Sequence, residues 1–249
     1  MKITMGWGVR TGIAAGAVAL IAGAASAGLS HIILQIQADV NGQVGTFSVP
    51  QSAGTWTGTS FSWTLAAPTP IMSRTGLQLG IVTDASVFVI EDPVVAVNFN
   101  IVSTAANTNF TIASPLLSFP TMTGAVGAAS AAVSVTDLFG DGATLTPSGG
   151  GAYSAEYNGL VPTGTNFATL LDSAVTAGAF STATASDEFP GGGLFAPIAG
   201  NISDISARWQ FTLSPDDLAS GTGVFTVVPA PSALAVVAVG GLLAGRRRR

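Results

Sequence analysis

The chain has 249 residues, of which only 8% are charged, against about 25% in an ordinary soluble domain. Between residues 28 and 228, thirteen acidic residues stand against two basic ones, Arg74 and Arg208, which gives this stretch a net charge of −11. A surface this acidic repels nucleic acid and anionic lipid, so we expect no nucleic-acid partner.

The first 27 residues have the three parts of a secretory signal peptide. Lys2 and Arg10 give the positively charged start, and the apolar run that follows, 12–24, is short and rich in alanine and glycine. A membrane-spanning helix needs about 20 apolar residues, so a permanent anchor is the weaker alternative. Ala25 and Ala27 fit the small-residue pattern of a cleavage site, and we predict that residues 1–27 are removed.

Residues 28–228 show the alternation of apolar and polar residues that is typical of half-buried strands. The clearest case is 205–213, where each odd-numbered residue is apolar and each even-numbered residue is polar. Similar patterns, separated by Gly, Pro, Asn and Asp, predict strands at 31–38, 61–65, 77–83, 86–90, 95–101, 108–113, 131–136, 152–157 and 222–228.

Helix signals in this stretch are weak. Only 167–175 and 215–218 have residues that favour a turn or two of helix. Many short strands without alternating helices predict an all-β fold, an antiparallel β-sandwich of jelly-roll or immunoglobulin-like type, formed by residues 28–228. The alternative is two smaller domains divided at the loop-like segment 115–127, but no Pro/Ser-rich linker marks that division.

One loop has residues that suit a metal ion. Residues 137–142 place Asp137 and Asp141 four positions apart, with glycines that permit a tight bend. Calcium prefers oxygen ligands, so these two aspartates form a candidate calcium site, although the loop lacks the middle ligand and the distal glutamate of an EF-hand. The alternative is a hairpin turn at Asp141-Gly142, which the sequence favours.

The sequence has few residues that could carry out catalysis. Cysteine is absent, which excludes thiol chemistry, and a Ser-His-Asp hydrolase would need the single histidine, His31, close to the expected new N-terminus. A glycoside hydrolase needs only two carboxylates. However, Glu91 and Glu188 sit beside proline-containing turns, and Trp56 alone is placed to stack on a sugar. We therefore predict that the protein is not an enzyme.

Residues 229–249 have the layout of a membrane-spanning tail. The seventeen residues from Pro229 to Gly245 are the lower limit for a spanning helix, which arginine snorkelling extends. The terminal arginines predict that this end stays on the cytoplasmic side, with residues 28–228 outside. The tail consists of a border, Pro229, Ala230, Pro231 and Ser232, an uncharged run, 233–245, and the cluster Arg246, Arg247, Arg248 and Arg249.

This order of proline motif, apolar helix with a Gly-Gly-Leu-Leu step at 240–243 and arginine cluster resembles the PEP-CTERM sorting domain, with Pro-Ala-Pro in place of Pro-Glu-Pro. The resemblance is confined to the tail, 229–249. It implies a Gram-negative-type bacterium in which an exosortase-type enzyme cuts near Pro229 to Ser232. The body would then pass from an inner-membrane tether to the cell surface or the extracellular matrix.

Two functions remain open for residues 28–228. The first is an exported, non-catalytic structural or adhesive sandwich, in contact with extracellular polysaccharide. The second is a calcium-dependent carbohydrate-binding module to which the loop 137–141 contributes, and a strip of aromatic side chains or a cluster of carboxylates in the folded chain would favour it. A glycoside hydrolase has the least support, since it requires two carboxylates about 5–10 Å apart in one cleft.

Overall fold

The computed structural model describes residues 28–230. The expected cleavage residues Ala25 and Ala27, the border residues Pro231 and Ser232, and the arginine cluster 246–249 lie outside the described residues. Between residues 28 and 230, no helix is long and apolar enough to cross a membrane.

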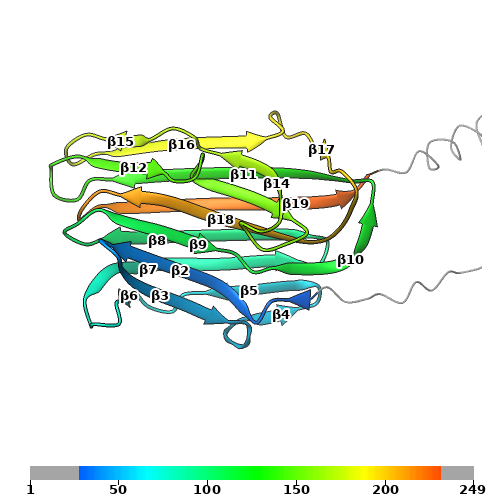
Figure 1. The fold of residues 1–249 in the computed structure, drawn as a ribbon, viewed down its shortest axis with the longest axis horizontal. Helices are drawn as coiled ribbons and strands as arrows, with labels where there is room; N and C mark the ends of the chain where they lie inside the picture. The colour runs from blue at the N-terminus through cyan, green and yellow to red at the C-terminus, as the bar shows by residue number, and fades with distance from the viewer. Residues whose placement is uncertain (1–27, 231–249) are drawn as a thin grey trace, which may run out of the picture.

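The described chain forms two antiparallel sheets packed face to face, which confirms the predicted β-sandwich (Figure 1). A single short 3-10 helix, Gln51–Ala53, interrupts the strands in this part of the chain. The ten-stranded sheet A contains β1 (Gly28–Leu29), β2 (Ile32–Val40), β3 (Gln43–Pro50), β9 (Thr108–Ala113), β10 (Leu117–Thr123), β12 (Ala143–Pro147), β13 (Tyr153–Tyr157), β14 (Thr165–Leu170), β15 (Val175–Ala177) and β18 (Asn201–Leu213). The nine-stranded sheet B contains β4 (Thr55–Thr57), β5 (Ser60–Thr64), β6 (Thr69–Met72), β7 (Gln78–Ile90), β8 (Val94–Ser103), β11 (Ala125–Thr136), β16 (Thr182–Phe189), β17 (Ala196–Pro197) and β19 (Leu218–Pro229).

Four local predictions are wrong. The stretch 167–175, expected to be helical, contributes to β14 and β15, because these segments pair with β13 and β12. The stretch 215–218 forms a turn, in which Asp216 has a φ of 56°, and not a helix. The segment 115–127, expected to be loop-like, forms β10 and the start of β11. The two strands predicted at 77–83 and 86–90 are one strand, β7, with an irregular register between Val82 and Asp84.

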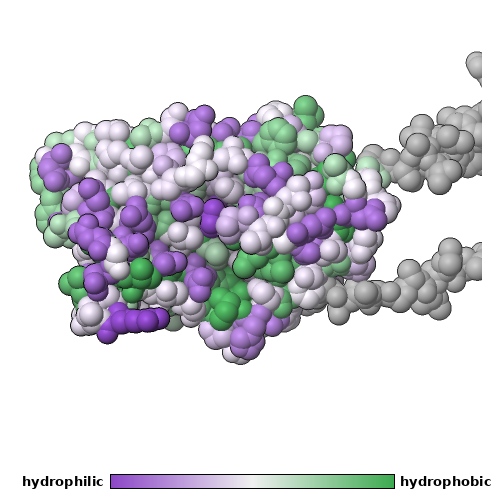
Figure 2. All heavy atoms as spheres, viewed as in Figure 1, coloured by the Kyte–Doolittle hydropathy of each residue, from purple (hydrophilic) through white to green (hydrophobic). Residues whose placement is uncertain are grey.

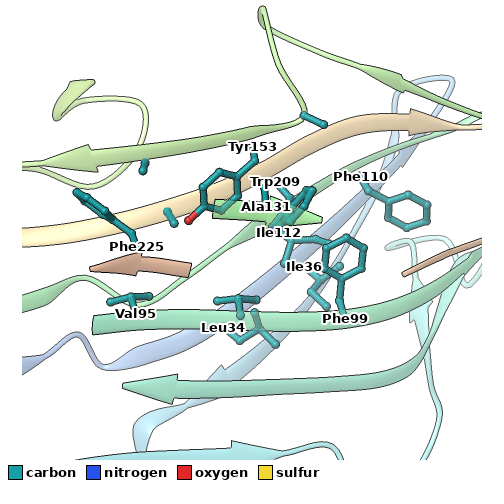
Figure 3. Packing of buried hydrophobic residues seen from close by; sticks show 14 of the residues in the cluster. Leu34, Ile36, Val95, Phe99, Phe110, Ile112, Ala131, Tyr153, Trp209 and Phe225 are labelled. Atoms are coloured by element: carbon teal, nitrogen blue, oxygen red, sulfur yellow. The ribbon is translucent and has the colours of Figure 1, made fainter. Parts of the chain in front are cut away.

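Aromatic side chains from both sheets meet in the centre of the sandwich (Figure 3). Trp209 of β18 packs edge-on against Phe99 of β8 in the opposite sheet, with ring centroids 5.3 Å apart. It also meets Tyr153 of the neighbouring strand β13 at 5.1 Å. Gly223 of β19 leaves room for these rings, since a Cβ there would lie 2.4 Å from a carbon of Tyr153. One continuous core cluster includes residues from Ile33 to Val227.

The strand register brings both ends of the described chain to one end of the sandwich, on the right in Figure 1. Gly28 pairs with Ser118 in sheet A, and Pro229 pairs with Ala125 in sheet B. We call this the proximal end. At the opposite or distal end, β11 finishes and β19 begins, and the connections 137–142, 178–181 and 214–217 lie together.

Candidate metal centre

The carboxylate of Asp137 accepts several backbone hydrogen bonds at the distal end. Its Oδ1 accepts from the amides of Phe139 (3.3 Å) and Gly140 (3.1 Å), and its Oδ2 accepts from Gly140 (2.9 Å) and Phe180 (2.5 Å). Burial opposes ionisation of this carboxyl, but the amide hydrogens outweigh it and hold the pKa of Asp137 below its ordinary value. The side chain therefore shapes its own loop and fixes the neighbouring segment at Phe180.

Asp217 is completely buried in the turn between β18 and β19. Its Oδ2 accepts a short hydrogen bond from the hydroxyl of Ser214, but its Oδ1 is buried without a hydrogen-bond partner. Burial raises the pKa of Asp217, the Ser214 bond opposes this, and the charges of Asp137 and Asp141 add to it. The Leu138 amide lies near enough to favour the ionised form, yet it makes no hydrogen bond of ordinary geometry with Oδ1.

The exposed Asp141 completes a group of three carboxylates. One oxygen from each of Asp137, Asp141 and Asp217 lies within 4.8 Å of the other two. Two oxygens bound to the same calcium ion at about 2.4 Å each are at most about 4.8 Å apart, so the spacing fits a shared cation. The structure thus brings the two predicted residues together and adds a third.

Sequence reasoning missed Asp217 and misread the turn. The expected hairpin at Asp141-Gly142 is wrong, because β11 belongs to sheet B and β12 to sheet A, so the loop between them crosses from one sheet to the other. The glycines at 140 and 142 do adopt positive φ values, 93° and 90°. A signal for Asp217 was present, since a proline and two aspartates at 215–217 mark a turn directly after the clearest strand.

Two exposed aromatic rings flank the carboxylates. Phe139 is 70% exposed and Phe180 is 74% exposed, and both belong to the segments that Asp137 holds. A Cβ on Gly140 would lie 2.4 Å from the Phe180 ring, so this ring packs over the loop backbone. The distal end therefore has three carboxylates, two of them buried, with exposed aromatic rings beside them.

The other residues considered for chemistry lie apart from this group. His31 is an exposed residue directly before β2, and Trp56 is half-buried, with its ring 5.4 Å from that of Phe61. Glu91 lies in the turn between β7 and β8, at the proximal end, and Glu188 lies on the edge strand β16. Glu156 is buried on β13, in the other sheet. The three glutamates thus come from three separate parts of the sandwich.

Glu156 makes the stability of the chain depend on pH. Its Oε2 accepts from the Gly164 amide at 2.9 Å, and burial raises the pKa of this carboxyl above its ordinary 4.5, against the opposing effects of that bond and of Arg208. The folded chain therefore holds the proton at pH values where the unfolded chain has lost it. Stability should fall as the pH rises from about 4.5 through the raised pKa.

The variant Glu156→Gln tests this dependence, because it keeps the acceptor for Gly164 and removes the charge. We expect Glu156→Gln to have a higher Tm than the wild type at neutral pH. The difference in Tm between the two proteins should vanish as the pH falls toward 4.5. Thermal unfolding followed by tryptophan fluorescence across this pH range is the measurement. Equal Tm values for the two proteins at neutral pH would contradict the prediction.

A second feature is a shallow depression of about 440 Å³ on the outer face of sheet B. Strands β7, β8, β11, β16 and β19 each contribute a polar side chain to it. Apart from the carboxylate of Asp84, these are hydroxyl and amide groups, which form hydrogen bonds with polar ligands without adding charge. The polar lining includes Asp84, Asn98, Asn100, Ser134, Thr184 and Thr222.

Neither a family model nor a curated protein matches this chain. Among solved structures, a chain titled "Structure of infectious bursal disease virus Gt strain" aligns with 10% identity and a TM-score of 0.14. The alignment covers 82% of this chain and 66% of the viral one, so this chain spans a little under two thirds of the viral length. A likeness of this size carries no argument about fold or function.

Proposed function

We propose that this chain is an exported, non-catalytic β-sandwich that has a structural or adhesive role at the bacterial cell surface or in the extracellular matrix. The supporting observation is the arrangement of its ends. Because the described chain begins and finishes at the proximal end, a membrane tail that follows Ala230 leaves the distal end free. This is the arrangement that a tethered domain needs to reach a partner away from the membrane.

The face of the domain seen in Figure 2 suits a passive role. On the face seen in Figure 2, strongly apolar residues occur only in small, separate patches among weakly polar ones. Small patches of this kind are normal for a soluble domain and give little drive for self-association. The net charge of −11 over residues 28–228 adds mutual repulsion between copies.

The sheet constrains where a sorting enzyme can cut. Pro229 pairs with Ala125 as the last residue of β19, and the amide of Ala230 donates to the Gly124 carbonyl at 3.0 Å. A backbone held in a sheet is poorly available to a protease, which acts on locally open chain. We therefore propose that the cut falls after Ala230, at or beyond Pro231 and Ser232 of the border.

The test is fractionation of the native bacterium combined with intact-mass analysis of the released protein. We expect a mature chain that begins at Gly28, ends at or after Ala230 and occurs in the surface or matrix fraction. Replacing Arg246–Arg249 with serine should shift the protein away from this fraction, while the matched variant Arg74→Ser should not. Cytoplasmic protein that still carries Met1 would refute export, and a mature chain that ends before Ala230 would refute the proposed cleavage point.

Carbohydrate binding is the second candidate, and two features favour it: the group of three carboxylates at the distal end and the depression on the outer face of sheet B. Its hydroxyl and amide groups are of the kind that hydrogen-bonds to sugar hydroxyls. Co-sedimentation of the released protein with purified extracellular polysaccharide separates the two candidates when it is repeated with Asn98→Ala, which removes one amide from the depression. Co-sedimentation that this variant loses supports a carbohydrate-binding site, and protein that stays in the supernatant, or a variant that co-sediments as the wild type does, supports a structural role.

A further inference from the structure

The buried carboxylate of Asp217 has an unsatisfied oxygen that the fold does not explain. Its Oδ1 is inaccessible to solvent and has no hydrogen-bond partner, while two further carboxylates lie beside it. An ionised carboxylate is costly to bury unless it is paired or coordinates a metal. The nearby charges of Asp137 and Asp141 increase that cost. Something positive is therefore expected between the three side chains.

We propose that Asp137, Asp141 and Asp217 bind one calcium ion, which joins the loops of the distal end. The proposal goes beyond the role at the cell surface and does not depend on it, since the carboxylates belong to the folded domain. It adds Asp217, from the turn between the last two strands, to the pair of aspartates in the 137–142 loop.

The oxygens have the chemistry and the spacing that calcium requires. Calcium takes six to eight oxygen ligands at about 2.3–2.6 Å, whereas magnesium demands a tighter octahedron at about 2.0–2.1 Å. Oxygens up to 4.8 Å apart fit two calcium bonds better than two magnesium bonds. The exposed Asp141 offers a path for the ion to enter, and solvent on that side can supply the remaining ligands.

Asp137 can serve the ion and the loop at once. An ionised carboxylate has about four acceptor positions. The amides of Phe139, Gly140 and Phe180 make four contacts with its two oxygens, and Gly140 divides one N–H between them. Carboxylates that bind metals commonly accept hydrogen bonds as well, so these contacts orient Asp137 and are compatible with an ion. Calcium would then link the 137–142 loop to the turn at Asp217. Because the Phe180 amide donates to Asp137, the segment at Phe180 would be held in the same group.

The competing way to neutralise the group is to protonate Asp217. The two alternatives differ in what they require of the solution. A protonated Asp217 needs no metal, so calcium would have no effect on stability at neutral pH. An ionised Asp217 with calcium predicts that chelation of the metal destabilises the chain.

The experiment is thermal unfolding of the full chain at neutral pH, with EDTA or with about 10 mM calcium chloride at matched ionic strength. For an extracellular-type site with a dissociation constant of about 0.1–1 mM, calcium should raise the Tm by about 3–10 °C. Asp217→Asn should abolish the shift, and should be more stable than the wild type in EDTA because it removes the unpaired charge. Asp92→Asn, an exposed change at the proximal end, should keep the full shift.

Three results would overturn the proposal: no calcium shift in the wild type, the same shift with magnesium, or a full shift in Asp217→Asn. Should Asp217→Asn fail to fold, the exposed Asp141→Asn carries the same test, because it leaves the buried turn intact. Calorimetric titration of the wild type should then give one site per chain, and the Asp141 variant should bind at least ten times more weakly. Equal affinity of the two proteins would contradict the assignment.

Discussion

Replacing Trp209 with alanine is expected to lower the free energy of unfolding by about 3–5 kcal/mol. The side chain is 1% exposed and contacts aromatic rings in both sheets, Phe99 across the sandwich and Tyr153 beside it. Truncation would leave a cavity that rigid strands on both sides cannot close. The loss should appear as a drop in Tm of about 6–20 °C, at about 2–4 °C per kcal/mol for a domain of this size.

Trp56→Ala is the matched control for this change. Trp56 belongs to the short edge strand β4, is half-buried, and has one aromatic neighbour, Phe61. Its truncation removes less buried area and lets solvent fill the gap, so the drop in Tm should be less than half that of Trp209→Ala. Calorimetry of both variants measures the difference. If the two variants lost equal stability, the central position of Trp209 in the core would be refuted.

Gly223→Ala should cost about 1–3 kcal/mol, although alanine is ordinarily the better residue in a strand. An added Cβ would lie 2.4 Å from a ring carbon of Tyr153 and 2.9 Å from the Trp209 Nε1. Both rings are buried and packed against each other, so neither can move without disturbing the contact between the sheets. We expect the variant to have a lower midpoint in urea with an unchanged slope, because the loss comes from packing in the native state.

A second glycine separates this steric effect from a general effect of alanine. A Cβ added to Gly191 would have no atom within 4 Å, and this residue does not need a positive φ. Gly191→Ala should therefore leave the midpoint unchanged or raise it slightly, because it restricts the unfolded chain. A loss at Gly191 as large as that at Gly223 would show that contact with the rings is not the cause.

The alternation of apolar and polar residues along the sequence predicted the strands well where one face of a strand is buried and the other meets solvent. The stretch 205–213 is the best example, and the structure extends it back to Asn201 through a segment that pairs with β10 and buries Ile202. Alternation failed at 167–175, where short strands at the margin of sheet A depend on their neighbours and not on their own pattern. Local preference favoured helix there, and pairing between strands overrode it.

The candidate site was half predictable. Asp137 and Asp141 lie in one loop, so their spacing along the chain was enough to pair them. Asp217 joins them only because β18 and β19 turn back at the same end of the sandwich at which β11 finishes. Its burial and its unpaired oxygen are properties of the packed fold, which no local pattern of residues reports.

The position of the last two strands determines when the chain can fold during synthesis. β18 pairs with β9, β10, β12 and β13, and β19 lies between β8 and β11, so each is an interior strand of its sheet. A growing chain that has not yet released residues 201–229 lacks the middle of both layers, including Trp209 and Phe225. Its earlier strands can pair with one another, as β2 does with β3 and β7 with β8, but they lack the strands that close the core. Cooperative folding must therefore wait until residues 201–229 are available. Until then, the closed sandwich cannot form, which is the condition that the proposed export would require.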